Sequence, residues 1–181
     1  MKRLAIFLAA AFMTATICGC GPKTPDGMPP LQPTTITVTQ GSAPLANAVL
    51  NIKSSDPSTT NNFTCGGTTD ANGVAVVVTH GQYKGIPEGK YKVAVSCTVG
   101  EGTPPPPSPI DEESARKWKE YQDSGATYEE FYVVDPKFAT IESTNLEIEV
   151  KKGKNEFTLD CGEPVHIPVN NGKGASGVGG F

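Results

Sequence analysis

The sequence predicts an all-β protein, an antiparallel sandwich of seven short strands with one helical insertion. Apolar and polar side chains alternate in short runs, which is the period of a half-buried strand. Turn-forming Gly, Pro, Asn and Asp residues separate most of the runs, as antiparallel sheets require. The seven runs span residues 34–39, 48–52, 63–65, 74–78, 89–99, 146–150 and 157–161.

The first four runs are joined by segments with turn chemistry. Ile36 and Val38 share one face of the first run, and Gly41-Ser42-Ala43-Pro44 precedes the second. Before the fourth run, Asn72-Gly73 follows Asp70, and both residues tolerate positive φ. We therefore expect a β-hairpin at this turn.

The later runs have the clearest alternation. Tyr91, Val93, Val95, Cys97 and Val99 fall on one face of the fifth run. The last two runs repeat the pattern around the polar segment 152–155, with these apolar positions: Leu146, Ile148, Val150, Phe157, Leu159 and Cys161. Each of these strands should bury one face in the sandwich core.

Residues 100–141, approximately, form an insertion that a compact sandwich does not need. After the proline run 104–107, Ser108 is suited to cap a helix that has Pro109 at its first position and ends at Gly125. Residues 127–130 resemble a second capping box. The insertion is therefore predicted to be helical.

Aromatic residues of the insertion are the candidate binding residues: Trp118, Tyr121 and Tyr128, followed by Phe131 and Tyr132. A loop with clustered aromatic side chains on a rigid scaffold is a common recognition site. Alternatively, Trp118 and Tyr121 dock the helix onto the sandwich. We favour docking here, because an apolar helical stripe normally faces a core.

The N-terminus has the pattern of an export signal. Lys2 and Arg3 precede an apolar run of about 14 residues, 4–17, and Ile17-Cys18-Gly19-Cys20 follows. This tetrapeptide resembles the lipobox of bacterial lipoproteins. The resemblance implies that residues 1–19 are removed and that acyl chains (palmitate) on Cys20 anchor the protein in membrane lipid, in the bacterial cell envelope facing the periplasm or the exterior. A secreted protein without lipid and a membrane-spanning helix are the alternatives, but the run is shorter than the roughly 20 residues that a span needs.

Composition divides the remaining chain into three parts. Residues 20–33 are rich in proline and should form a spacer, residues 34–164 form the sandwich domain, and the Gly-rich residues 165–181 should be a disordered tail. Without Lys2 and Arg3, 13 of the 15 basic residues remain against 19 acidic ones. This balance argues against nucleic acid as a partner.

The order of the turns and strands resembles the transthyretin-like, or carboxypeptidase-regulatory-like, domain family. The resemblance rests on residues 43–48 before the second strand, 67–73 at the fourth and 87–93 at the fifth, and extends through residues 135–157. It implies a seven- or eight-stranded Greek-key (prealbumin-like) sandwich. In the pattern of runs, the helical insertion lies between strands five and six.

Cys65, Cys97 and Cys161 share strand parity with apolar neighbours and should point inward. In an oxidising exterior one disulfide is expected, and three pairings are possible. The strand order of the resembled fold favours Cys97 with Cys161. A metal site is the alternative, but the close ligand spacing of such sites is missing.

No motif of catalysis stands out around the two histidines, His80 and His166. We therefore expect no enzyme, no cofactor and no metal, but a lipid-anchored structural or binding module of the cell envelope. An adhesive module that binds an envelope protein or a glycan through the aromatic insertion is the alternative. A hydrolase that uses His80 is a third hypothesis.

Overall fold

The computed structural model describes residues 25–56 and 63–169. The predicted export signal, the predicted lipidation site Cys20, the start of the predicted spacer and most of the Gly-rich segment 165–181 lie outside these residues. Within the described part, no helix combines the length and the apolar character needed to cross a bilayer.

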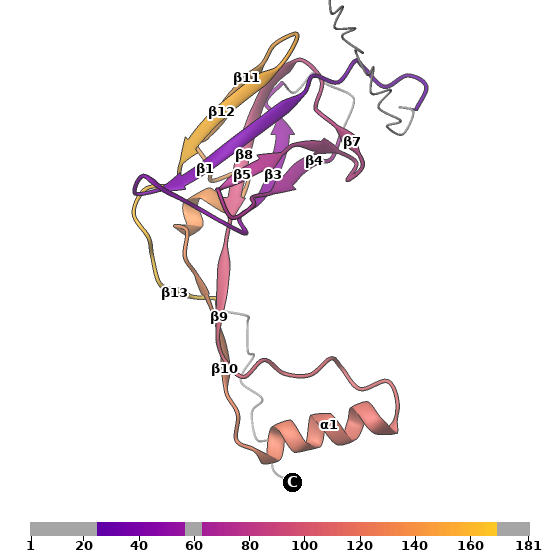
Figure 1. Ribbon diagram of the computed structural model, residues 1–181, viewed down its shortest axis with the longest axis vertical. Helices are drawn as coiled ribbons and strands as arrows, with labels where there is room; N and C mark the ends of the chain where they lie inside the picture. Colours follow the sequence, from indigo (N-terminus) through magenta and orange to yellow (C-terminus); the bar gives the residue numbers. More distant parts are fainter. Residues whose placement is uncertain (1–24, 57–62, 170–181) are drawn as a thin grey trace, which may run out of the picture.

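Two sheets account for the main body of the protein (Figure 1). The larger has the order β11-β8-β3-β4-β6-β7, with bounds Glu147–Val150, Gly89–Ser96, Val49–Ser54, Cys65–Thr68, Val78–Thr79 and Tyr83–Lys84. In the other, β1 (Thr34–Gln40) pairs with β12 (Asn155–Asp160), β2 (Ala43–Pro44) and β5 (Val74–Val76). The predicted all-β, sandwich-like class is confirmed at this level, and each of the seven predicted runs contains or adjoins one of these strands.

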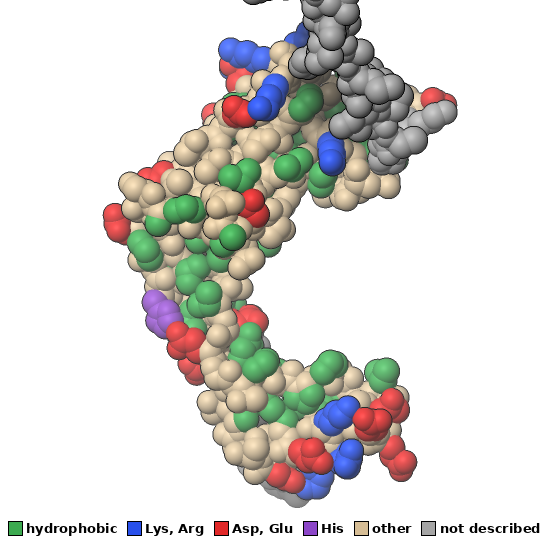
Figure 2. Space-filling view, in the orientation of Figure 1, with side chains coloured by type: hydrophobic (Ala, Val, Ile, Leu, Met, Phe, Trp, Pro, Cys, Tyr) green, Lys and Arg blue, Asp and Glu red, His purple; other side chains and the backbone are tan. Residues whose placement is uncertain are grey.

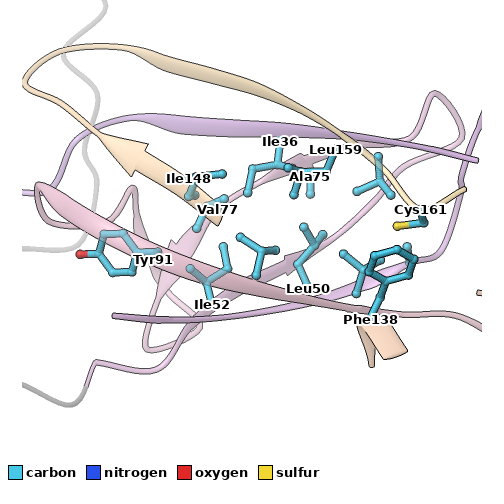
Figure 3. Close-up of a cluster of buried hydrophobic side chains, with 14 of the residues drawn as sticks. Ile36, Leu50, Ile52, Ala75, Val77, Tyr91, Phe138, Ile148, Leu159 and Cys161 are labelled. Carbon is cyan, nitrogen blue, oxygen red and sulfur yellow. The ribbon is translucent and has the colours of Figure 1, made fainter. Parts of the chain in front are cut away.

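The core lies between the two sheets (Figure 3). Ile36 and Val38 from β1 and Ile52, Val93 and Val95 from the larger sheet are almost completely buried. Along β1 the buried positions alternate with half-buried ones, as the sequence pattern predicts. Each such aliphatic side chain contributes roughly 1.5–3 kcal/mol by leaving water, so this cluster holds the sheets together.

One pair of strands departs from the predicted antiparallel arrangement. β1 and β12 run parallel, with Thr34 opposite Asn155 and Thr39 opposite Asp160. The turn at residues 151–154 crosses from the larger sheet, where β11 pairs with β8, to the smaller one. β12 therefore starts at the same end of the sandwich as β1, where the Asn155 N–H donates to the Pro33 carbonyl at 2.8 Å.

The predicted hairpin at Asp70 is a tight turn, but it joins strands of different sheets. Asp70 Oδ1 accepts hydrogen bonds from the N–H groups of Asn72 (2.8 Å) and Val74 (2.9 Å). Gly73 has φ 73°, and a Cβ there would lie 2.6 Å from the Val38 oxygen. β4 pairs with β3, and β5, directly after the turn, pairs with β1 of the smaller sheet. The chain then returns to the larger sheet as β6, which pairs antiparallel with β4 through Cys65–Thr79 and Gly66–Val78. The predicted antiparallel pairing of the two runs is therefore confirmed away from the turn, but the strand next to the turn does not take part in it.

The end of the predicted spacer belongs to the sandwich. Gln32 is buried and forms an isolated bridge with Ile86, and its Oε1 accepts a hydrogen bond from the Gly153 N–H at 2.7 Å. Asn155 completes this end of the sandwich by donating to the carbonyls of Lys151 and Gly153, both at 2.8 Å. The domain therefore begins at or before Gln32, not at Thr34.

The predicted Cys97–Cys161 disulfide is not formed. Cys65, Cys97 and Cys161 are buried as predicted, but all three are free thiols. The Cys97 sulfur points to the Ala46 carbonyl oxygen at 3.7 Å, and the Cys65 sulfur lies 3.6 Å from Thr79 Oγ1. Each of these two thiols thus has a polar neighbour other than a second sulfur.

A third, small sheet projects from the sandwich and carries the helix (Figure 1). It consists of β9 (Thr98–Gly102), β10 (Tyr128–Tyr132) and β13 (Ile167–Pro168), and α1 (Glu112–Asp123) lies beyond it. β13 pairs with β10, so the segment 165–169, predicted as the start of a tail, is part of this sheet. The short helix η1 (Pro136–Phe138) returns the chain to the core, where Phe138 is buried.

Two local predictions for the insertion are corrected. α1 is capped by Asp111 rather than Ser108, because Asp111 and Ser114 form a reciprocal capping box. Residues 128–132 form the strand β10 and not a second helix start. There the pairing with β9 overrides the local capping pattern.

Candidate binding surface on the projecting arm

β9, β10, β13 and α1 together form a projecting lobe that we call the arm (Figure 2). Its base is fixed to the sandwich, because β9 follows β8 almost directly and the Val133 N–H donates to the Cys97 carbonyl at 3.1 Å. Gln40, at the end of β1, donates from Nε2 to the Val133 carbonyl at 2.6 Å. The arm is thus a continuation of the sandwich strands.

One face of the arm sheet sets Tyr128 against two glycines of β9. Tyr128 stands opposite Gly102, and Glu130 stands opposite Gly100. The Tyr128 ring occupies the space in which a Cβ on Gly100 would lie. Gly102 has φ +94°, and a Cβ there would collide with the Thr127 carbonyl oxygen. The glycines therefore permit the Tyr128 ring to lie flat across β9.

The opposite face combines an aromatic stack with carboxylates. The His166 ring stacks on Phe131 with a centroid distance of 4.0 Å and an interplanar angle of 12°. His166 Nε2 also lies 3.7 Å from Glu101 Oε1. Glu101 and Glu129 are direct cross-strand neighbours, an arrangement of like charges that weakens a sheet.

Helix α1 buries none of its residues, so the predicted docking onto the sandwich was wrong. Trp118 and Tyr121 contact each other, with ring centroids 5.8 Å apart, and the Tyr121 hydroxyl donates to the Thr103 carbonyl at 2.9 Å. The helix is thereby attached to the arm's own chain. Figure 2 shows hydrophobic side chains along the part of the arm that faces the open space between arm and sandwich.

Charged pairs stabilise α1 on its solvent side. Lys117 lies 2.8 Å from Glu113 and Lys119 lies 2.7 Å from Asp123, both at i,i+4 spacing. Such exposed pairs contribute about 0.3–0.5 kcal/mol each. Together with the capping box they account for a helix that lacks a core to pack against.

The predicted binding residues lie in two places on the arm. Trp118 and Tyr121 are together on α1, whereas Tyr128 lies on β10, and within the described residues no ring contact joins it to either. All three side chains are half-buried. Sequence reasoning missed the roles of Gly100 and Gly102 and the stack of His166 on Phe131. Glycine at alternate positions of a strand was the available signal for the two glycines.

The arm is acidic. Residues 98–132 include eight Asp or Glu and three Lys or Arg, and the acidic side chains lie on both the sheet and the helix. Such a surface complements a partner with basic groups and disfavours an anionic one.

The buried cysteines are poor nucleophiles and no cation site is formed among the described residues. Burial raises the pKa of Cys65 and Cys97, and burial together with the Asp160 charge raises that of Cys161 to about 11, so the thiols stay protonated at neutral pH. His80 and His166 belong to separate aromatic pairs. No group of three His, Cys, Asp or Glu side chains converges in the described part of the chain.

Comparison with known proteins gives no match: no family model, no curated protein and no solved structure is significantly similar to the chain.

Proposed function

We propose that the chain is a lipid-anchored, non-enzymatic binding module of the bacterial cell envelope and that the arm is its recognition element. The observation that carries this proposal is the exposure of the arm: α1 buries no residue, yet its aromatic side chains and those of β10 are ordered by contacts within the arm. An insertion that only completed the core would be packed on it. A rigid scaffold that presents aromatic side chains is typical of recognition sites.

The positions of the two ends of the sandwich support this role. The chain approaches the sandwich at Gln32, beside the 151–154 turn, and the arm leaves from the opposite end, where Gln40 contacts Val133. β1 spans the distance between these ends. The chain between Cys20 and Gln32 is about 40 Å long at most when fully extended. A tether at Cys20 would therefore hold the sandwich near the membrane and direct the arm away from it.

The proposed partner is an envelope protein or a glycan. The arm offers aromatic rings, unpaired strand edges and acidic side chains, which suit a polypeptide with basic groups, whereas stacking on Trp118 or Tyr128 would suit a sugar. The transthyretin-like Greek-key assignment of the sandwich is part of the same proposal. It is supported by the order of the predicted strands along the chain.

The anchor is tested by labelling growing cells with a radioactive or alkyne-bearing palmitate. The wild-type chain should take up the label and fractionate with the membrane, and Cys20→Ala should do neither. Labelling that persists in Cys20→Ala would contradict the anchor.

The recognition role is tested by cross-linking the protein to its neighbours in the native envelope. Trp118→Ala and Tyr128→Ala should lose a cross-linked neighbour that the wild type retains. Val76→Ala is a matched control, because Val76 is an exposed apolar residue of the sandwich. Equal loss in the control, or an unchanged pattern in both arm variants, would contradict the role of the arm.

A further inference from the structure

The outer face of the larger sheet contains a hollow that is separate from the arm. A cavity of about 440 Å³ is lined by β3, by residues 63–64 and by the segment that follows η1. Its polar and aromatic lining consists of Asn51, Lys53, Phe63, Thr64, Thr140 and Glu142. This volume is within the range of about 300–1,000 Å³ that small-ligand sites occupy.

Small residues of the sheet create the hollow. Asn51 is on the outer face of β3, and its cross-strand neighbours on that face are Gly66 and Ala94. A Cβ on Gly66 would collide with the Leu50 carbonyl oxygen, so β4 cannot carry a larger side chain there. On the two strands beside β3, Asn51 thus has no cross-strand neighbour larger than a methyl group.

Both walls of the hollow are held in place. The Phe63 ring packs edge-on against His80, with centroids 5.6 Å apart, and His80 adopts the left-handed φ of 51° that lets its N–H donate to the Thr64 carbonyl at 2.7 Å. On the other side, the Thr144 N–H donates to the Thr140 carbonyl, and buried Thr144 Oγ1 donates to the Val93 carbonyl. These contacts fix the segment that carries Thr140 and Glu142 against β8.

The hollow is lined by one cationic and one anionic side chain, Lys53 and Glu142. Lys53 stands directly opposite Lys92, which places two positive charges side by side on the sheet. Lys92 has Glu147 as its neighbour on β11. Among the described residues Lys53 has no carboxylate within ion-pairing distance, and Glu142 on the facing wall has no cation.

We propose that this hollow binds a saccharide unit that carries a carboxylate. Lys53 would bind the carboxylate, Asn51 offers both donors and acceptors to hydroxyl groups, and Glu142 accepts hydrogen bonds from them. The Phe63 ring suits the apolar C–H face of a sugar ring. A small inorganic anion fits less well, because it leaves Asn51, Glu142 and Phe63 without a ligand group to contact.

The test uses the purified full chain and two probes, glucuronate and its uncharged counterpart glucose, with binding measured by saturation-transfer NMR. Glucuronate should bind with a Kd on the order of 1 mM, as expected for a ligand of this size, and glucose about tenfold more weakly. Lys53→Gln should weaken glucuronate binding about tenfold and leave glucose unchanged, whereas Asn51→Ala should weaken both. Lys53→Arg, which keeps the charge, should bind glucuronate like the wild type.

Lys117→Gln on α1 is the matched control for charge, and it should bind both sugars like the wild type. No glucuronate binding, equal binding of the two sugars, or an equal effect of Lys117→Gln would each overturn the proposal. Displacement of glucuronate by acetate at the same concentration would overturn it as well, since it would show a general anion effect. The hollow lies outside the arm and its ligand does not depend on lipidation, so failure of this proposal would leave the proposed function standing, and the reverse.

Discussion

The exposed position of α1 predicts that Trp118→Ala leaves the sandwich nearly as stable as the wild type. If α1 were docked on the core, removal of the Trp118 side chain would cost about 3–5 kcal/mol. In the structure Trp118 is half-buried, and among the described residues its ring contacts one other ring, that of Tyr121, at a centroid distance of 5.8 Å. An aromatic pair contributes about 0.5–1.5 kcal/mol, and here the contribution is to α1 alone. We therefore expect the global free energy of unfolding to fall by less than about 1 kcal/mol.

Urea unfolding followed by far-ultraviolet circular dichroism measures this difference, with Ile52→Ala as the comparison. Ile52 is 1% exposed and belongs to the core cluster, so its truncation should cost about 2–5 kcal/mol. The two variants should have equal m-values, which would show that both report the same unfolding transition. A loss of 3 kcal/mol or more, roughly that of a core truncation, in Trp118→Ala would refute the exposed position of α1.

Trp118 also provides a direct spectroscopic check, because it is the single tryptophan of the chain. Its fluorescence in the native protein should be quenched efficiently by acrylamide. A strongly protected Trp118 would again indicate that a core covers α1.

Further predictions concern the thiols, the turns and the base of the arm. The three buried thiols, Cys65, Cys97 and Cys161, should react with Ellman's reagent only after denaturation. Peptide mapping without reductant should find Cys97 and Cys161 unlinked. A linked pair of peptides would contradict the structure. Asn155→Ala should lower the free energy of unfolding by about 1–3 kcal/mol, because it leaves the Lys151 and Gly153 carbonyls unpaired, and an unchanged urea midpoint would disprove this. Gly102→Ala imposes strain of about 1–3 kcal/mol, because the backbone has φ +94° there. Amide hydrogen exchange should become faster in β10 but not in β8. An equal acceleration of exchange in both strands would argue against a separate arm. Hydrogen bonds from the Val74 and Asn72 N–H groups lower the pKa of Asp70. The stabilising contribution of the Asp70 carboxylate is therefore present above about pH 4 and is lost as the pH falls through the lowered pKa. Asp70→Ala should remove this part of the acid sensitivity, which urea titrations at several pH values would measure.

Alternation of apolar residues was sufficient to place the strands of the sandwich but not to pair them. Ile36 and Val38 are buried as predicted, because an inward-facing strand position is a property of the local pattern. The pairing of β12 with β1 depends on where the 151–154 turn directs the chain, and a polar turn sequence has the same appearance whether it joins neighbouring strands or crosses between sheets. For the same reason the sequence did not show that β5, directly after the Asp70 turn, joins the other sheet before β6 returns to pair with β4.

The insertion shows a different limit of sequence reasoning. The apolar stripe with Trp118 and Tyr121 predicts a face that packs on a core, yet α1 buries none of its residues. The periodicity of a helix reports that one side is apolar but not what covers that side. Residues 127–130 have a capping pattern, but their strand conformation is determined by β9, which lies 26 residues earlier at the Tyr128–Gly102 pair. A long-range contact of this kind leaves no local signal.

The separation of core and arm explains how the two can change independently. The sheets are held by side chains such as Ile36, Ile52 and Val93, none of which belongs to the arm. The arm depends on contacts within the arm itself: the capping box of α1, the Tyr121–Thr103 hydrogen bond and the glycines under Tyr128. Substitutions on the arm should therefore alter binding with little cost in folding, whereas any change at the arm's base, where Gln40 holds Val133, affects both. Gln40→Ala is thus expected to combine a loss of stability with a loss of partner cross-linking, and Tyr128→Ala to show the second effect alone.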